Sequence, residues 1–130
     1  MRPVGSDGPE RLEKSVEIGT LCAFYGRLLT QRQQDALRLH YEEDLSLGEI
    51  AEELGVSRQN VHELITRSVQ KLRRYEEALG GVQRAEQTAR ELRKAEGLLT
   101  GLSGLSEIDK SRLQEARAMI RRVILKQEGE

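Results

Sequence analysis

Apolar positions in the stretch Leu47–Leu72 recur every three or four residues, and a glycine divides them into two runs. Ser46 precedes the first run, and Glu49 lies three residues after Ser46. This combination forms a capping box at the start of a helix. Gly55 ends this run, and glycine tolerates the positive φ found where helices end. Ser57 can cap a second, longer run. The pattern predicts a short helix, a tight turn and a long helix, which together make a helix-turn-helix.

The second helix of this motif divides into an apolar stripe and polar positions. We expect Leu54, Val61, Ile65 and Leu72 to lie in the core. In a DNA-reading helix-turn-helix, the polar residues at the start of the second helix face the base edges. The sequence therefore predicts a contact set for a nucleic acid or a protein partner, made of Ser57, Arg58, Gln59, Asn60, His62, Arg67 and Lys71.

Helical spacing also predicts elements before the motif. Residues 1–9 contain both prolines and two glycines, and we interpret them as a disordered lead-in. A helix is expected from Glu10 to about Phe24, apolar over so much of its circumference that it should be heavily buried. A further helix is expected from Gln31 to about Glu43, with Thr30 as its cap.

Two more amphipathic helices are expected after Gly80 and Gly81, one over residues 82–99 and one from Ser106 to about Lys126. A short turn joins them, so they predict an αα-hairpin. The expected organisation is the lead-in, a helix-turn-helix domain over residues 10–80 and a hairpin over residues 81–130. The apolar stripe of the hairpin needs a partner, which is either the N-terminal core or a second copy of the chain, and we expect a homodimer.

The composition agrees with an all-α protein. Charged residues make up 33% of the 130 residues and aromatic residues 3%, whereas a β-rich chain would need more aromatic and β-branched residues. The longest nearly apolar run, Ile18–Tyr25, is far shorter than the roughly 20 residues that span a bilayer. The N-terminus lacks the apolar segment of a signal peptide, and Cys22 is the only cysteine, so we expect a cytoplasmic protein.

No pattern in the chain predicts catalysis. We find no nucleophile and base at a recognisable spacing and no glycine-rich phosphate loop. Cys22, His40 and His62 do not have the spacing of metal ligands. We therefore expect neither an enzyme nor a metal or cofactor site.

Two resemblances meet in the motif. The run LLTQRQQDALRLHYEEDLSLGEIAEELGVSRQNVHELITRSVQKLRR resembles region four of bacterial sigma factors, the part that reads promoters. Residues 12–80 are more similar still to the YlxM family of small bacterial helix-turn-helix proteins. The similar segments are LEK at Leu12–Lys14, FYGRLLT at Phe24–Thr30, LSLGEIAEELGVSRQ at Leu45–Gln59 and YEEALG at Tyr75–Gly80.

The resemblance to the YlxM family implies a regulatory or accessory protein of the signal recognition particle pathway, because the genes of its members lie beside those for the particle's GTPase and its receptor. The implied partners are that GTPase, the particle's RNA, or both. The chain departs from the family where Arg27 replaces a frequent proline, and where Asn60 and His62 replace the expected alanine and tyrosine.

Charge bears on the choice of ligand. Residues 58–74 carry five basic residues and one acid, whereas residues 42–53 carry six acids and no base. Phosphate neutralisation supplies much of the affinity for nucleic acid, so the basic segment favours binding and its acidic neighbour opposes it. Two functions stay open: an accessory protein that binds protein or RNA of the particle, and a dimeric DNA-binding transcriptional regulator.

Overall fold

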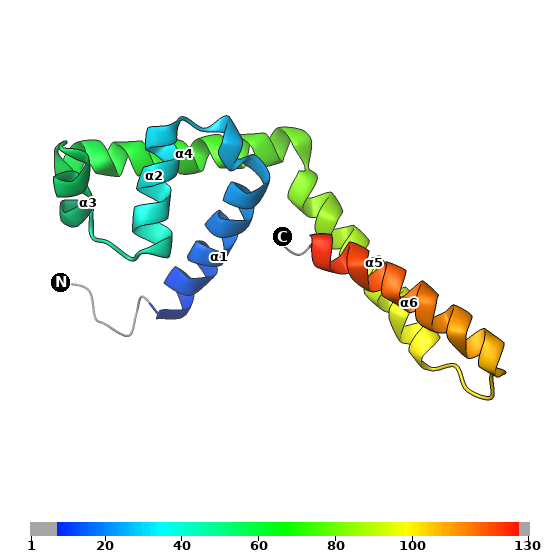
Figure 1. Ribbon diagram of the computed structural model, residues 1–130. Helices are drawn as coiled ribbons and strands as arrows, with labels where there is room; N and C mark the ends of the chain where they lie inside the picture. The colour runs from blue at the N-terminus through cyan, green and yellow to red at the C-terminus, as the bar shows by residue number, and fades with distance from the viewer. Residues whose placement is uncertain (1–7, 128–130) are drawn as a thin grey trace. The chain divides into compact units, whose positions relative to one another are not determined.

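The computed structural model describes residues 8–127, and within this range the chain is helical with no strand (Figure 1). By its internal contacts the chain divides into two compact units, one up to Gly80 and one from Gly81 onward. The expectation of a disordered lead-in falls mainly on residues outside the described range, and the two described ones, Gly8 and Pro9, belong to the first helix. The predicted all-α fold class is confirmed.

The first unit begins with α1 (Gly8–Tyr25), which continues into a short 3-10 turn, η2 (Gly26–Leu28). Helix α2 (Gln31–Leu37) follows, with Thr30 and Gln33 forming a capping box, and it passes directly into the π-helix η3 (Arg38–Glu42). The sequence predicted one α-helix over α2 and η3. The wider π turn is a finding of the structure.

The helix-turn-helix has the predicted form. Helix α3 (Leu47–Leu54) starts at the capping box of Ser46 and Glu49, and it ends at Gly55, whose φ is 69°. Helix α4 (Arg58–Leu79) is the longest of the first unit, and α1, α2 and α3 all pack against it. Figure 1 shows these three helices arranged along α4.

The core of the first unit lies along α4. Val61, Ile65 and Leu72 are buried as predicted, whereas Leu54 is only half-buried. Ser68 is also buried, and its hydroxyl donates to the Leu64 carbonyl, so it leaves no unsatisfied polar atom. The apolar side chains buried with these are Ile18, Leu21, Tyr25, Leu29, Ala36, Leu37, Leu39, Ile50, Ala51 and Val69.

The expectation that the first helix is heavily buried was wrong. Ile18, Leu21 and Tyr25 are buried, but Leu12 and Val16 are 67% and 62% exposed. Helix α1 packs against α4, η2 and η3 within its unit, so it is covered along one side only.

The second unit is a helical hairpin. Helix α5 (Gly81–Thr100) and helix α6 (Glu107–Gln127) pack against each other along their length. Ser106 caps α6 by accepting a hydrogen bond from the Asp109 backbone N–H, and the Arg121 guanidinium lies 3.1 Å from the Glu96 carboxylate. Ala85, Ala89 and Ile124 are its buried residues.

Candidate nucleic-acid interface

The start of α4 is built by local hydrogen bonds. The Ser57 hydroxyl accepts from the Asn60 backbone N–H at 3.1 Å, and the Val56 backbone N–H donates to the Ala51 carbonyl across the turn. These bonds fix the exit from α3 and the first turn of α4. Ser57, which the sequence placed in the contact set, is therefore the cap that presents the contact residues behind it.

The predicted contact residues do not form one continuous strip. Arg58 and Arg67 are nine residues apart on an uninterrupted helix, which is about two and a half turns, so they point to opposite sides of α4. His62 lies one turn after Arg58 and shares its side, whereas Asn60 lies about two turns before Arg67 on the other side. All four side chains are exposed.

A groove lies along the side of α4 that carries Arg67. It encloses about 360 Å³ and runs between α2 and the later turns of α4. We call it the cationic groove, and its lining residues are Gln33, Arg67, Gln70, Lys71 and Arg74. Three cations and two amides line it and no carboxylate does, which is the donor set that binds phosphate oxygens.

The cations of the groove are available to a ligand. Arg67, Lys71 and Arg74 make no hydrogen bond or ion pair with any residue of the described range, 8–127. Arg73 differs, because its guanidinium lies 3.2 Å from the Glu17 carboxylate and ties α4 to α1. Of the five Lys and Arg residues of α4, Arg73 is therefore structural, whereas Arg58 and the three cations of the groove have no partner within residues 8–127.

Sequence reasoning placed Arg67 and Lys71 in the contact set but left out three residues of the groove. Arg74 follows Lys71 by three residues and Gln70 follows Arg67 by three, so helical spacing alone could have added both. Gln33 could not have been found this way, because only the packing of α2 against α4 brings it to the groove.

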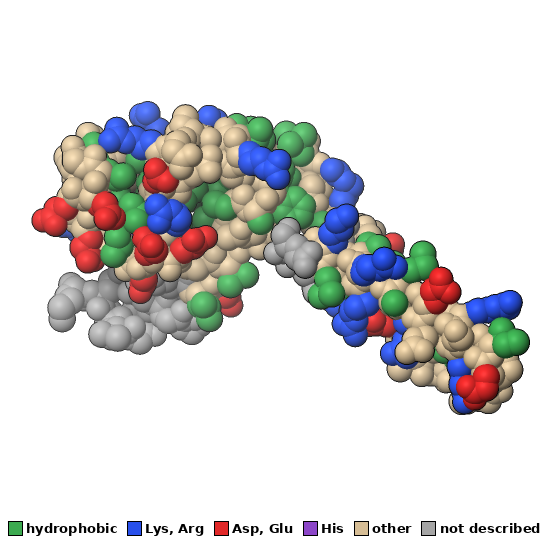
Figure 2. Space-filling view, viewed as in Figure 1, with side chains coloured by type: hydrophobic (Ala, Val, Ile, Leu, Met, Phe, Trp, Pro, Cys, Tyr) green, Lys and Arg blue, Asp and Glu red, His purple; other side chains and the backbone are tan. Residues whose placement is uncertain are grey.

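The acidic residues of the motif gather on α3. Glu49, Glu52 and Glu53 are exposed, and acidic side chains collect at the left edge of Figure 2, over α3. The Ser46 backbone N–H donates to the Glu49 carboxylate at 3.0 Å, and this hydrogen bond lowers the pKa of the Glu49 carboxyl. The three carboxylates would repel a phosphate backbone that approached α3.

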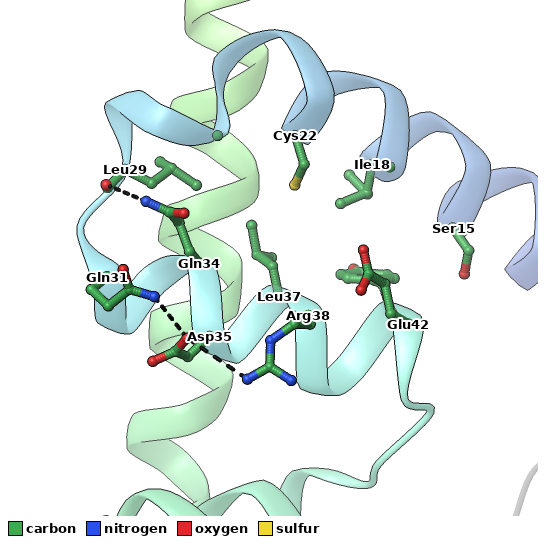
Figure 3. A pocket seen from close by; sticks show the side chains of 13 residues that line it. Ser15, Ile18, Cys22, Leu29, Gln31, Gln34, Asp35, Leu37, Arg38 and Glu42 are labelled. Atoms are coloured by element: carbon green, nitrogen blue, oxygen red, sulfur yellow. Dashed lines mark hydrogen bonds and ion pairs between the residues drawn. The ribbon is translucent and has the colours of Figure 1, made fainter. Parts of the chain in front are cut away.

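A second hollow, of about 380 Å³, lies between α1 and the α2–η3 segment (Figure 3). Figure 3 shows the Cys22 sulfur turned into it beside Ile18 and Leu37. Burial raises the pKa of the Cys22 thiol, and the charge of Glu42 raises it further. A thiol of this kind stays protonated at neutral pH and is a weak nucleophile, so the hollow lacks the chemistry of a cysteine active site.

The family model described as "Putative helix-turn-helix protein, YlxM / p13 like" matches residues 12–100. The chain belongs to this family. It is 48% identical over 85 residues to a UPF0122 protein of Desulforamulus reducens, which covers 65% of this chain and 73% of the relative. It is 44% identical over 89 residues to a UPF0122 protein of Bacillus cereus, which covers 68% of this chain and 81% of the relative. A third relative, from Symbiobacterium thermophilum, is 58% identical over 65 residues, or 50% of this chain and 61% of its own.

The match to the YlxM family confirms the resemblance drawn from the motif. The match also extends beyond residue 80, where that resemblance ended, and includes the whole of α5. Helix α6 begins at Glu107, beyond the matched range. A family of helix-turn-helix proteins with an all-helical fold indicates a regulatory role in binding nucleic acid.

Residues 8–127 contain no group of three or more His, Cys, Asp or Glu side chains placed to hold a metal ion. Over the same residues, every helix is too short or too polar to cross a bilayer.

Proposed function

We propose that this YlxM family member is a regulatory or accessory protein of the signal recognition particle pathway and that it binds the RNA of the particle through the cationic groove. The observation that carries the proposal is a groove lined by Arg67, Lys71 and Arg74, with no carboxylate in its lining and no ion pair to these cations within the described chain. The pathway itself is inferred from the family resemblance.

The position of the groove favours RNA over duplex DNA. In DNA-bound helix-turn-helix proteins, the first helix of the motif crosses the phosphate backbone while the start of the second enters the major groove. Here the first helix is α3, and Glu49, Glu52 and Glu53 would face that backbone. The three cations lie on the middle and later turns of α4, away from α3, where they can grip a phosphate chain without entering a groove of bases.

Binding of the particle RNA can be measured by fluorescence anisotropy at several salt concentrations. We expect the triple variant Arg67→Ala, Lys71→Ala, Arg74→Ala to bind on the order of 100-fold more weakly at about 0.1 M salt, with a shallower salt dependence, because three phosphate contacts are lost. Arg74→Ala and Arg73→Ala are the matched pair of single variants, since each removes one positive charge from α4, but only Arg73 is tied to Glu17, so Arg73→Ala should weaken binding less.

Two results would contradict this function. One is that the triple variant binds the RNA as well as the wild type does. The other is that the wild type binds the particle RNA no better than an unrelated RNA of the same length. A pull-down from a native lysate that recovers the particle's GTPase without the RNA would identify a protein partner instead.

A second candidate is a dimeric DNA-binding transcriptional regulator. The observation that favours it is the complete helix-turn-helix, in which the Ser57 cap presents Arg58, Gln59 and Asn60 on the first turn of α4. These are side chains that pair with guanine and adenine edges. Selection from a random DNA pool at low salt tests it, and two half-sites about one helical turn apart are the expected result. A pool that yields no enriched motif would eliminate this candidate.

A further inference from the structure

Helix α6 has a covered face and an exposed one. Ile124 is buried against α5, while Leu113 and Ile120 are half-buried on the same side. Four large apolar side chains of α6 are exposed, namely Ile108 (67%), Met119 (56%), Leu125 (50%) and Val123 (41%), and the first two share one side of the helix. The hairpin therefore leaves part of its apolar surface unpartnered within its own unit.

Apolar and charged residues follow one another in a symmetrical order along this exposed face. It reads Ile108, Arg112, Glu115 and Met119, at spacings of four, three and four residues. These spacings keep all four side chains on one stripe of the helix. Arg112 and Glu115 are exposed, and neither makes an ion pair or hydrogen bond with another residue of the described range. We call these four residues the α6 stripe.

The α6 stripe is complementary to itself. It reads apolar, positive, negative, apolar, with symmetrical spacing. When two copies lie antiparallel, Ile108 of each copy meets Met119 of the other, and Arg112 meets Glu115. A two-fold interface requires this reciprocity, since residue i must suit residue j and residue j must suit residue i. In a parallel pair, Arg112 would face Arg112 and Glu115 would face Glu115.

We propose that α6 is a homodimerisation helix and that two copies of the chain pair antiparallel through the α6 stripe, about a two-fold axis between Arg112 and Glu115. The charges of the whole helix agree with this arrangement. Glu107 lies at its start, whereas Arg122 lies in its second half. Antiparallel pairing sets Glu107 of each copy near Arg122 of the other.

The same features argue against nucleic acid or a membrane as the partner of the α6 stripe. A phosphate backbone offers no apolar surface to Ile108 and Met119, and a membrane surface would have to accept the carboxylate of Glu115 in the middle of the stripe. The contact spans about three helical turns, so we expect a modest, reversible dimer. It concerns the second unit alone and does not depend on the proposed binding of RNA.

Charge reversal tests the pairing in the full-length protein. Sedimentation analysis over a range of concentrations should show a dimer for the wild type. Arg112→Glu and Glu115→Arg should each raise its dissociation constant by about tenfold or more, because two like-charge contacts replace two ion pairs. Arg117→Glu, on the opposite side of α6, makes the same charge change and should leave the constant unaltered. Circular dichroism checks that each variant remains helical.

A mixture of the two variants provides the decisive measurement. Arg112→Glu and Glu115→Arg repel their own copies but complement each other, so an equimolar mixture should form a heterodimer as readily as the wild type forms its dimer. A change confined to one helix cannot produce this rescue. A wild type that stays monomeric at every concentration, or a mixture that shows no heterodimer, would overturn the proposal.

Disulfide trapping tests the direction of the pair. In a Cys22→Ser background, Ile108→Cys and Met119→Cys should cross-link rapidly when the two variants are mixed and slowly when either is alone. Faster cross-linking of Ile108→Cys with itself would show a parallel pair and overturn the antiparallel arrangement. Equal rates in all three samples would show that the stripe is not the interface.

Discussion

The Tyr25 hydroxyl donates a 2.5 Å hydrogen bond to the Glu76 carboxylate, which fastens the last residue of α1 to the last turn of α4. The Tyr25 ring is buried, and its centroid lies 6.0 Å from that of Tyr75. Helix α1 is covered along one side only, so this bond and the Glu17–Arg73 ion pair are polar contacts that hold it on α4.

Removing the Tyr25 hydroxyl should therefore destabilise the first unit. We expect Tyr25→Phe to lower the free energy of unfolding by about 1 to 2 kcal/mol, because it leaves a part-buried carboxylate without this donor. Urea denaturation measures the change. Tyr75→Phe is the control, since the structure shows no hydrogen bond from that hydroxyl within residues 8–127. Equal effects of the two substitutions would show that the bond to Glu76 contributes nothing specific.

Val61 lies in the core between the motif helices and is completely buried. We expect Val61→Asp to unfold the first unit, because an unpaired carboxylate in the core costs several kcal/mol, a large share of the stability of a small domain. Far-ultraviolet circular dichroism during heating measures the loss. His62→Asp is the neighbouring control at an exposed position, where an acid near the start of a helix is tolerated. A cooperative transition near the wild-type temperature for Val61→Asp would contradict the packing described.

Arg58 is exposed and has no ion pair or hydrogen bond within the described chain. Arg58→Ala should leave the melting temperature nearly unchanged and weaken ligand binding, and we expect a smaller loss of RNA affinity than Arg67→Ala gives. Thermal melting and anisotropy on the same preparations measure both. A strong drop in melting temperature would show that Arg58 is structural and would remove it from the contact set.

Cys22 provides a prediction about pH. Its folded pKa is raised above the ordinary value of 9.0 by burial and by Glu42. The folded state therefore prefers the neutral thiol, and the resulting stability is present below pH 9 and is lost as the pH rises through the folded pKa. Alkylation by iodoacetamide should accelerate with a midpoint above pH 9. Glu42→Gln should shift that midpoint downward, and an unchanged midpoint would exclude the electrostatic contribution.

The motif could be predicted closely from the sequence because its boundaries depend on local chemistry. Ser46, Ser57 and Thr30 all cap the helices they were expected to cap, and Gly55 has the left-handed conformation expected at the end of α3. These interactions join residues only a few positions apart. The local sequence pattern and the capping preferences of the residues are therefore almost sufficient to predict these interactions.

The remaining features depend on packing between distant segments. No residue type distinguishes the π-helix Arg38–Glu42 from the α-helix before it, and at its exit Asp44 has the positive φ, 59°, that usually indicates glycine. Likewise, the sequence shows that α1 is apolar but not how many neighbours it has. The contribution of Gln33 to the cationic groove depends on where α2 lies against α4.

The half-turn offset between Arg58 and Arg67 limits the size of molecule that can use both. They are separated by about 14 Å along the axis of α4 as well as by its width. A mononucleotide or a free phosphate can reach one of them, whereas a strand that reaches both must pass around the helix. Affinity should consequently rise in two steps as an oligonucleotide is lengthened, and the protein would discriminate between polymers and the small phosphorylated metabolites around it.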